Sequence, residues 1–233
     1  MGTLYIVSTP IGNLQDITLR AIDVLNSVDF ILCEDTRTSS VLLRNIEKEF
    51  PKFQNKAKLV SYYEENEMQR IPEIIDLFKK DYKFALISDA GTPTISDPGF
   101  KLVRECVREK IKVESIPGAS SILAALTSSG LPTDKFMFIG FLPKKPGHRT
   151  DLLKKIKNSL EIISQTVILF ESPFRVVKTL EELQEVFGDI EVVLARELTK
   201  IHEEVKQGKI SDLLKQYKNA NPKGEFVILF NLK

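Results

Sequence analysis

Residues 85–99 read ALISDAGTPTISDPG, and this stretch decides the expected fold. A short apolar strand ends at Ile87, and residues 88–99 then hold two each of Asp, Gly, Pro, Thr and Ser before a helical pattern starts at Phe100. A plain strand-to-helix connection takes about two to six residues. Ligands of open parallel sheets bind beyond the carboxyl ends of the strands. The stretch therefore predicts a parallel sheet that carries a ligand-binding loop.

The first half of the chain alternates short apolar runs with helical patterns. Continuous apolar strands joined by helical crossovers are typical of a parallel sheet with helices on both faces. We expect strands at residues 4–7, 30–33, 59–62, 84–88 and 113–116, and helices at 16–28, 37–46, 68–80 and 100–110. Pro72 is expected in the first turn of its helix or at a kink.

The second half of the chain has a different order of helices and strands. We expect helices at residues 120–130, 149–160, 173–188 and 210–217, strands at 136–141, 167–170, 192–195 and 226–230, and a further short segment at 203–206. Two of these strands have no long crossover between them, which predicts a mixed sheet. The expected fold is therefore two α/β domains. Residues 1–117 form the domain with the parallel sheet, and residues 118–233 form the domain with the mixed sheet.

Composition limits the classes of function. The chain has 233 residues and a net charge of +1, so any nucleic-acid surface must be a local patch. Cys33 and Cys106 have no metal or redox spacing, and only two histidines are present. We therefore expect no metal site. The sequence has neither a signal-peptide pattern nor an apolar run of membrane-spanning length, and we expect a cytoplasmic protein that does not contact membranes.

Polar and turn-forming residues follow several of the expected strands. They occupy residues 8–13, 34–37, 88–99, 117–121 and 197–200. In a parallel sheet the first four of these loops meet at one edge, where Gly and Pro allow close approach and Ser, Thr and Asp supply hydrogen bonds. The alternative is that each loop is only a turn. Neither a P-loop nor a G-x-G-x-x-G motif is present to explain them.

Eight stretches, in order along the chain, carry a resemblance to a known family. They are LYIVSTPIGNLQDIT, CEDTR, ISDAGTPTISDPG, PGASSILAAL, SGLPTDKFMFIGFLPKK, FESPFR, LARELTK and KGEFVILF. The chain resembles the tetrapyrrole-methylase superfamily of S-adenosylmethionine-dependent methyltransferases. Within it, the resemblance is to the enzymes that methylate the ribose 2′-oxygen of a cytidine in 16S ribosomal RNA. Phe174 stands where members of that family often carry a His.

The resemblance implies a cofactor, S-adenosylmethionine, in a cleft between the two domains, and a homodimer. It implies cofactor contacts from Pro10, Asp89, Ala90, Gly91, Thr92, Ile95, Ser120, Ser121, Phe170, Glu171 and Leu198. A glycine at position 91 suits close approach of a ligand, and carboxylates suit the ammonium and ribose hydroxyls of the cofactor. Alternatives are open for three of these residues: Ile95 and Phe170 as core residues, and Ser120 as a helix N-cap.

Transfer of a methyl group to a ribose hydroxyl needs help with a proton. The hydroxyl is a weak nucleophile, so a base, or a cation that lowers its pKa, would assist. The candidates are polar residues at strand ends: Glu34, Asp35, Arg37, Glu197 and Lys200. The alternative is that Arg37 forms only a structural ion pair with Asp35 or Glu34.

The expected partner is 16S rRNA or the 30S subunit, which requires a positive surface. Residues 144–157 contain six Lys or Arg and one acid, Asp151. Such a basic stripe could bind phosphates, and Lys144, Lys145 and Arg149 are the expected contacts. The alternative is an ordinary solvated helix face. The phenylalanines that alternate along residues 136–141 are interpreted as core residues.

Two other functions stay open at this point. One is a methylase of tetrapyrroles or other small molecules, because a fold does not fix a function. The other is a cofactor-binding module without catalysis. The motifs TPIGNLQDIT and SDAGTPTISDPG favour the RNA methyltransferase over the small-molecule methylase. The complete set of polar strand-end residues argues against a cofactor-binding module without catalysis.

Overall fold

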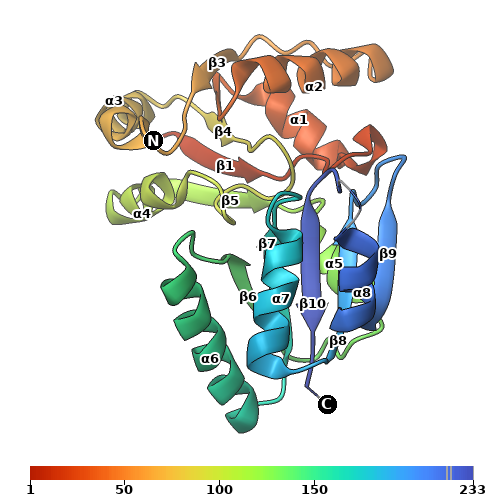
Figure 1. Cartoon of the computed structure of the whole chain (residues 1–233). Helices are drawn as coiled ribbons and strands as arrows, with labels where there is room; N and C mark the ends of the chain where they lie inside the picture. Colours follow the sequence, from red (N-terminus) through yellow and green to blue (C-terminus); the bar gives the residue numbers. More distant parts are fainter. Residues whose placement is uncertain (219, 221, 233) are drawn as a thin grey trace. The chain divides into compact units, whose positions relative to one another are not determined.

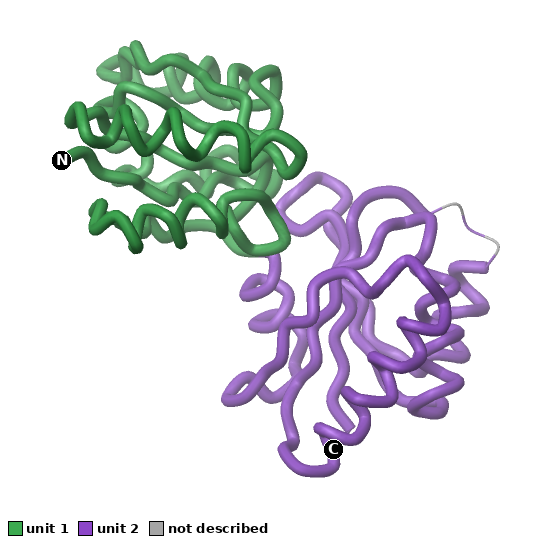
Figure 2. Tube along the Cα trace, turned by 90° about the vertical axis from the view of Figure 1, so that its left-hand side faces the viewer, with its two compact units in different colours: residues 1–120 green, residues 121–233 purple. Residues whose placement is uncertain are grey.

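The computed structural model describes residues 1–218, 220 and 222–232. The chain divides into two compact units, Met1–Ser120 and Ser121–Lys233, which are coloured separately in Figure 2. The division lies three residues beyond the boundary expected after Pro117. Each unit contains one five-stranded sheet.

Unit 1 is built on a parallel sheet. Its strands are β1 (Thr3–Val7), β2 (Phe30–Cys33), β3 (Lys58–Ser61), β4 (Phe84–Leu86) and β5 (Lys112–Ile116), in the spatial order β3-β2-β4-β1-β5. Every neighbouring pair is parallel. The helices are α1 (Leu19–Ser27), α2 (Thr36–Glu49), α3 (Glu67–Lys79) and α4 (Phe100–Arg108), with a short 3₁₀ helix η1 at Leu14–Asp16 (Figure 1). The predicted parallel sheet is confirmed.

Two hydrophobic layers hold this sheet. On one face, Leu4 and Ile6 of β1 join a buried cluster that includes Phe78 of α3 and Leu102 of α4. On the other face, Val7 joins a cluster built from α1 and α2. Alternate residues of a strand point to opposite faces, which explains why β1 is apolar at every position from Leu4 to Val7.

Unit 2 contains the mixed sheet that the sequence predicts. Its strands are β6 (Phe136–Phe141), β7 (Thr166–Glu171), β8 (Glu191–Arg196), β9 (Glu204–Lys209) and β10 (Phe226–Phe230), in the order β6-β7-β10-β8-β9. Only β6 and β7 pair in parallel, and the other pairs are antiparallel. The helices are α5 (Ser121–Ser128), α6 (Pro146–Ile162), α7 (Val176–Phe187) and α8 (Ile210–Tyr217). Residues of α6, α7 and α8 form one core with β7, β8 and β10 (Figure 1).

One helix contains a proline beyond its first turn, and another begins earlier than expected. Pro72 lies inside α3, beyond its first turn. Burial of Ile74, Ile75 and Phe78 on the same helix offsets the hydrogen bond that a proline removes. Helix α6 begins at Pro146 rather than near Arg149, because proline is well suited to the first helical position.

Within the described residues, no helix is both long and apolar enough to cross a membrane.

Candidate functional site

Three loops at the carboxyl edge of the unit 1 sheet are joined by hydrogen bonds. Thr9 and Gly91 form an isolated antiparallel bridge, with N···O distances of 2.9 and 3.1 Å. The hydroxyls of Ser8 and Thr92 lie 3.1 Å apart, and Thr92 Oγ1 donates to Ala119 O at 3.3 Å. The loops after β1, β4 and β5 therefore form one connected element, as expected for the ends of adjacent parallel strands.

Gly91 occupies a position that requires glycine. Its φ is +81°, in the left-handed region that side chains rarely adopt. A Cβ at this position would lie 3.2 Å from Ile11 Cγ2 and 3.9 Å from Ala119 O. Gly91 therefore allows the loop after β4 to pair with Thr9 in the loop after β1, a structural role that the sequence prediction of a cofactor contact did not include.

Left-handed backbone at residues other than glycine is concentrated in two of the predicted site loops. Among the described residues six such positions occur, and four of them are Thr94 (φ 74°), Ser96 (φ 62°), Glu197 (φ 51°) and Thr199 (φ 65°). For a β-branched threonine this conformation is a clear outlier, and backbone strain of this kind gathers at functional sites. No sequence signal marks these positions in advance.

The predicted cofactor contacts of unit 1 differ in exposure. Asp89, Ala90 and Ile95 are exposed, whereas Pro10 and Gly91 are buried. Thr92 and Ser120 are partly buried, as is Ser121, the first residue of unit 2. The exposed side chains after β4 are thus free to meet a ligand, and the buried residues support them. Ile95 is not a core residue, because 42% of it is exposed.

Two carboxylates at this edge have raised pKa values. Burial raises the pKa of Glu34, although part of its side chain reaches solvent, and the negative charges of Asp89, Glu65, Asp35 and Glu64 add to the effect. Partial loss of hydration, together with the negative charge of Asp35, also raises the pKa of Asp89, although Asp89 is exposed. A carboxylate with a raised pKa holds a proton more readily, so Glu34 is the better proton acceptor of the Glu34-Asp35 pair.

Asp35 has a structural role. Its carboxylate caps α2 by accepting from the Arg37 amide at 2.8 Å, and it also pairs with the Arg37 guanidinium at 2.7 Å. These bonds lower the pKa of Asp35 to about 2. A carboxylate of such low basicity is a poor general base, so the ion-pair alternative describes Asp35 and Arg37 well.

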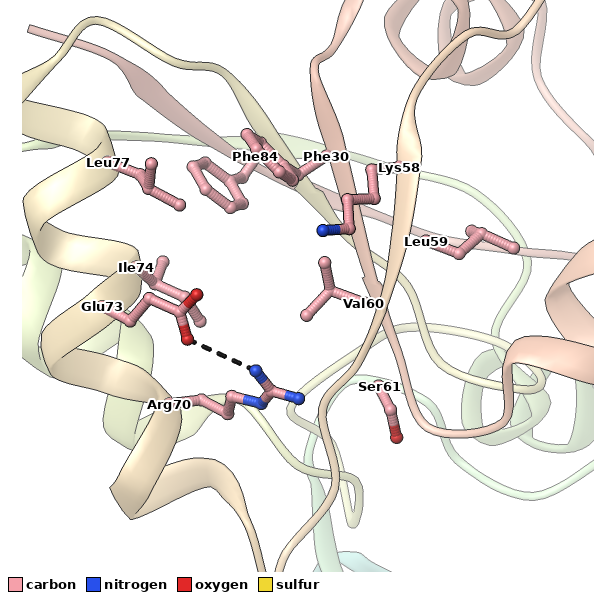
Figure 3. Close-up of a pocket in the computed structure, with 10 residues that line it drawn as sticks. All are labelled: Phe30, Lys58, Leu59, Val60, Ser61, Arg70, Glu73, Ile74, Leu77 and Phe84. Carbon is pink, nitrogen blue, oxygen red and sulfur yellow. Dashed lines mark hydrogen bonds and ion pairs between the residues drawn. The ribbon is translucent and has the colours of Figure 1, made fainter.

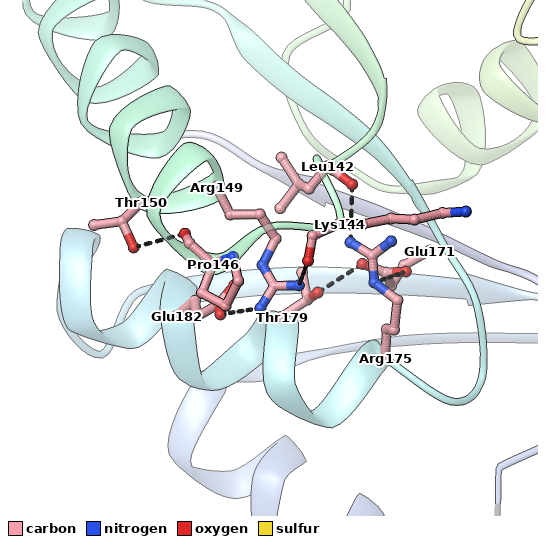
Figure 4. A network of polar contacts seen from close by, with 9 residues as sticks. All are labelled: Leu142, Lys144, Pro146, Arg149, Thr150, Glu171, Arg175, Thr179 and Glu182. Atoms are coloured by element: carbon pink, nitrogen blue, oxygen red, sulfur yellow. Dashed lines mark hydrogen bonds and ion pairs between the residues drawn. The ribbon is translucent and has the colours of Figure 1, made fainter.

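In unit 2, the carboxylate of Glu171 is buried in a polar network (Figure 4). Thr179 Oγ1 donates to Glu171 Oε2 at 2.6 Å, and the Ser172 amide donates to Oε1 at 2.8 Å. Arg175 forms an ion pair with the same carboxylate at 3.4 Å. Both oxygens therefore have partners within unit 2, and Glu171 orders the start of α7.

Three other predicted site residues of unit 2, Phe170, Glu197 and Leu198, are half-buried or buried, whereas Lys200 is exposed. Phe170 packs edge-on to Phe138, with ring centroids 4.9 Å apart, and Leu198 is buried. Lys200 Nζ donates to Glu197 Oε1 at 2.9 Å, and 37% of the lysine side chain is exposed. This pairing lowers the pKa of Glu197. The arrangement favours Lys200 as a cation rather than as a neutral base.

Arg149 must be removed from the predicted RNA contacts. Only 4% of its side chain is exposed, and its guanidinium pairs with the carboxylate of Glu182 on α7 (Figure 4). Arg149 lies on the face of α6 that also buries Leu153, Ile156 and Leu160, because these positions share one side of a helix. Lys144 and Lys145 are exposed. Lys157 is half-buried and donates to Val186 O at 2.9 Å. Fewer residues of the basic run 144–157 are therefore available to RNA than the sequence suggests.

A small pocket in unit 1 lies away from these loops. It has a volume of about 170 Å³ and lies between β3 and α3, with an apolar floor that includes Phe30, Phe84 and Leu77 (Figure 3). The ion pair Arg70–Glu73 (3.3 Å) stands at its polar side. None of the predicted site residues lines it. Ligand pockets typically measure about 300–1,000 Å³, so this one does not identify the site.

No three His, Cys, Asp or Glu side chains among the described residues are arranged to hold a metal ion.

Comparison with known proteins identifies the family. The sequence model described as Tetrapyrrole (Corrin/Porphyrin) Methylases matches residues 3–214. The chain belongs to the tetrapyrrole methylase family. The resemblance noted from the motifs is thereby confirmed, and the connected loops described above are part of a tetrapyrrole methylase fold.

Relatives and solved structures of the family extend over the whole chain. "Ribosomal RNA small subunit methyltransferase I" of Thermotoga maritima is 45% identical over 233 residues, which is 100% of both chains. The protein of the same name from Hydrogenobaculum sp. is 47% identical over 98% of this chain and 95% of its own. Uroporphyrin-III C-methyltransferase of Thermus thermophilus, solved with S-adenosylhomocysteine, has the same fold (TM-score 0.65, 18% identity, 98% and 97% coverage).

Proposed function

We propose that this tetrapyrrole methylase family member transfers a methyl group from S-adenosylmethionine to small-subunit ribosomal RNA, at the ribose 2′-oxygen of a cytidine. One observation carries the proposal. Relatives named as small-subunit rRNA methyltransferases match 98–100% of the length of this chain. A likeness over part of the chain would support only a shared domain. Here the relatives and this chain share both units.

The cofactor is assigned to the loops at the carboxyl edge of the unit 1 sheet. The hydrogen bonds that join Thr9 to Gly91 and Thr92 to Ala119 fix the loop backbone before a ligand arrives, which lowers the ordering cost of binding. Exposed Asp89 offers a carboxylate to the cofactor ammonium or to a ribose hydroxyl. A solved structure of the fold holds S-adenosylhomocysteine, the demethylated product of this cofactor. The contacts from Phe170, Glu171 and Leu198 stay predictions.

The reaction is an in-line displacement at the sulfonium methyl group. The ribose oxygen attacks, the carbon–sulfur bond breaks with its electrons going to sulfur, and the ribose loses its proton. Glu34, whose pKa is raised, is proposed as the acceptor of that proton. Lys200, held as a cation beside Glu197, is proposed to stabilise the developing alkoxide. Much of the remaining acceleration comes from orientation of the attacking oxygen.

The RNA contacts are assigned to Lys144 and Lys145 at the start of α6. Both side chains are exposed, and among the described residues no carboxylate forms an ion pair with either. Ammonium groups without partners are available to replace counterions on a phosphate backbone. The proposal includes the 30S subunit as the natural substrate and a homodimer as the active form.

Methyl transfer from radiolabelled S-adenosylmethionine tests the proposal. The purified protein is given 30S particles from a strain that lacks this methylation, with 50S particles as the matched control and a uroporphyrin-type tetrapyrrole as the competing substrate. We expect label in the 30S particles alone. Label in the tetrapyrrole alone would support the small-molecule methylase, and cofactor binding without transfer to any substrate would support a binding module.

A further inference from the structure

Phe174 has an unusual position in unit 2. It lies in the short turn between β7 and α7, and 93% of its surface is exposed. Single exposed apolar residues are common on proteins. A phenyl ring that the folded chain leaves almost bare is nevertheless free to pack on a planar partner.

The turn that carries Phe174 is held in place on both sides. The amides of Arg175 and Val176 donate to Ser172 O, each at 3.1 Å, and the Ser172 amide donates to buried Glu171 at 2.8 Å. Glu171 is fixed in turn by Thr179. A ring on such a turn loses little backbone freedom when it binds, which preserves affinity.

The same turn is bonded to the basic loop before α6. Arg175 Nη2 donates to Leu142 O at 2.9 Å, and buried Arg149 Nη1 lies 3.5 Å from Lys144 O (Figure 4). Strands β6 and β7 are parallel neighbours, so this loop and this turn leave the sheet at the same edge. Buried Arg149 and half-buried Arg175 thus fix the backbone that presents Lys144 and Lys145 relative to the backbone that presents Phe174.

A bare aromatic ring on a turn that is hydrogen-bonded to a loop with two exposed lysines matches the chemistry of single-stranded RNA. Proteins bind such RNA by stacking unpaired bases on aromatic side chains while cations contact the backbone. We propose that Phe174 is a stacking platform for an unpaired base of the rRNA substrate, beside the phosphates that Lys144 and Lys145 contact. This inference rests on the proposed function and adds a substrate-contacting residue to it.

Binding of 16S rRNA over a series of salt concentrations tests this assignment. Phe174→Ala should weaken binding about 5- to 150-fold without changing the slope of affinity against salt, because stacking releases no counterions. Lys144→Gln with Lys145→Gln should lower that slope by about one to two units. Phe174→Trp should retain affinity. The matched control is Ile162→Ala at the far end of α6, which removes another exposed apolar side chain (83% exposed). This variant should change neither the affinity for 16S rRNA nor its salt dependence.

The outcomes separate this inference from the function on which it rests. If Phe174→Ala binds 16S rRNA as tightly as the parent protein, or if Ile162→Ala weakens binding equally, the stacking role is wrong. A loss seen with 30S particles but absent with naked 16S rRNA would assign Phe174 to a ribosomal protein instead and overturn the proposal. Failure of the parent protein to bind or methylate any rRNA would contradict the proposed function itself.

Discussion

Thr9 and Gly91 exchange backbone hydrogen bonds in both directions, at 2.9 Å from the Thr9 amide and 3.1 Å from the Gly91 amide. This bridge joins the exits of β1 and β4, which are neighbours in the sheet although far apart in sequence. The proposed cofactor loop is therefore fixed at its centre, and its exposed residues extend from a supported backbone.

Gly91→Ala should destabilise unit 1. An alanine at φ +81° costs about 1–2 kcal/mol, and contact with Ile11 Cγ2 at 3.2 Å adds to that cost. Urea denaturation measures the difference. Gly130→Ala is the matched control, because Gly130 has φ +72° but nothing within 4 Å of a new Cβ, so it reports the backbone cost alone. Equal losses in the two variants would mean that contact with Ile11 has no effect.

Ala90→Leu tests the cofactor site without disturbing that bridge. Ala90 is exposed at the exit of β4, so a larger side chain meets solvent rather than the core. Titration calorimetry should show loss of S-adenosylmethionine binding, while the unfolding midpoint stays near that of the parent protein. Undiminished binding would place the cofactor elsewhere.

Glu34→Gln should stabilise the protein near neutral pH. Because the pKa of Glu34 is raised in the folded state, its ionisation opposes folding, and this cost grows as pH rises through the folded pKa. The melting temperature of the variant should exceed that of the parent at pH 7 and match it at acid pH, below the ordinary glutamate pKa.

Asp35→Asn is the opposite control, because the pKa of Asp35 is lowered to about 2 and its charge favours folding. This variant should be less stable than the parent at pH 7, and the difference should vanish as pH falls toward 2. Asparagine can still cap α2, so only the charge changes. A destabilised Glu34→Gln protein at pH 7 would contradict the electrostatic description of this edge.

Glu34→Gln and Lys200→Met should each slow single-turnover methylation. Positioned acid–base groups contribute about 10²–10⁴-fold to rate, so losses of that order are expected while cofactor binding remains nearly intact. The methylation rate of Asp35→Asn should fall less, because the Asp35 carboxylate of the parent protein is engaged with Arg37. If Glu34→Gln and Lys200→Met both methylate at the parental rate, neither residue assists the reaction, and only orientation of the attacking oxygen accelerates it.

The sequence was most informative where burial dominates. Strand β2 and helix α8 have the bounds that their apolar patterns predict, because their apolar residues are buried and each pattern ends at a clear break. Arg149 shows the limit of counting charges. A basic run suggested a solvated stripe, yet the spacing of Arg149, Leu153, Ile156 and Leu160 already placed the arginine on the buried face. Periodicity, considered together with charge, would have predicted its burial.

Other features of the site depend on contacts that no local pattern encodes. The left-handed backbone at Thr94 and Ser96 runs against the preference of both residue types, so only the surrounding fold can impose it. The raised pKa of Glu34 likewise arises from partial burial in the fold and from carboxylates on separate loops, Asp89 and Glu65 among them. The sequence locates these loops, but their electrostatics follow from the folded arrangement.

The position of the transferred methyl group tests the central claim most directly. 16S rRNA from 30S particles treated with this protein and isotopically labelled S-adenosylmethionine is digested to nucleosides and analysed by mass spectrometry. The proposed function predicts a labelled cytidine whose extra methyl mass stays with the ribose fragment. Label on a base, or no label in the rRNA while a tetrapyrrole is methylated, would contradict it.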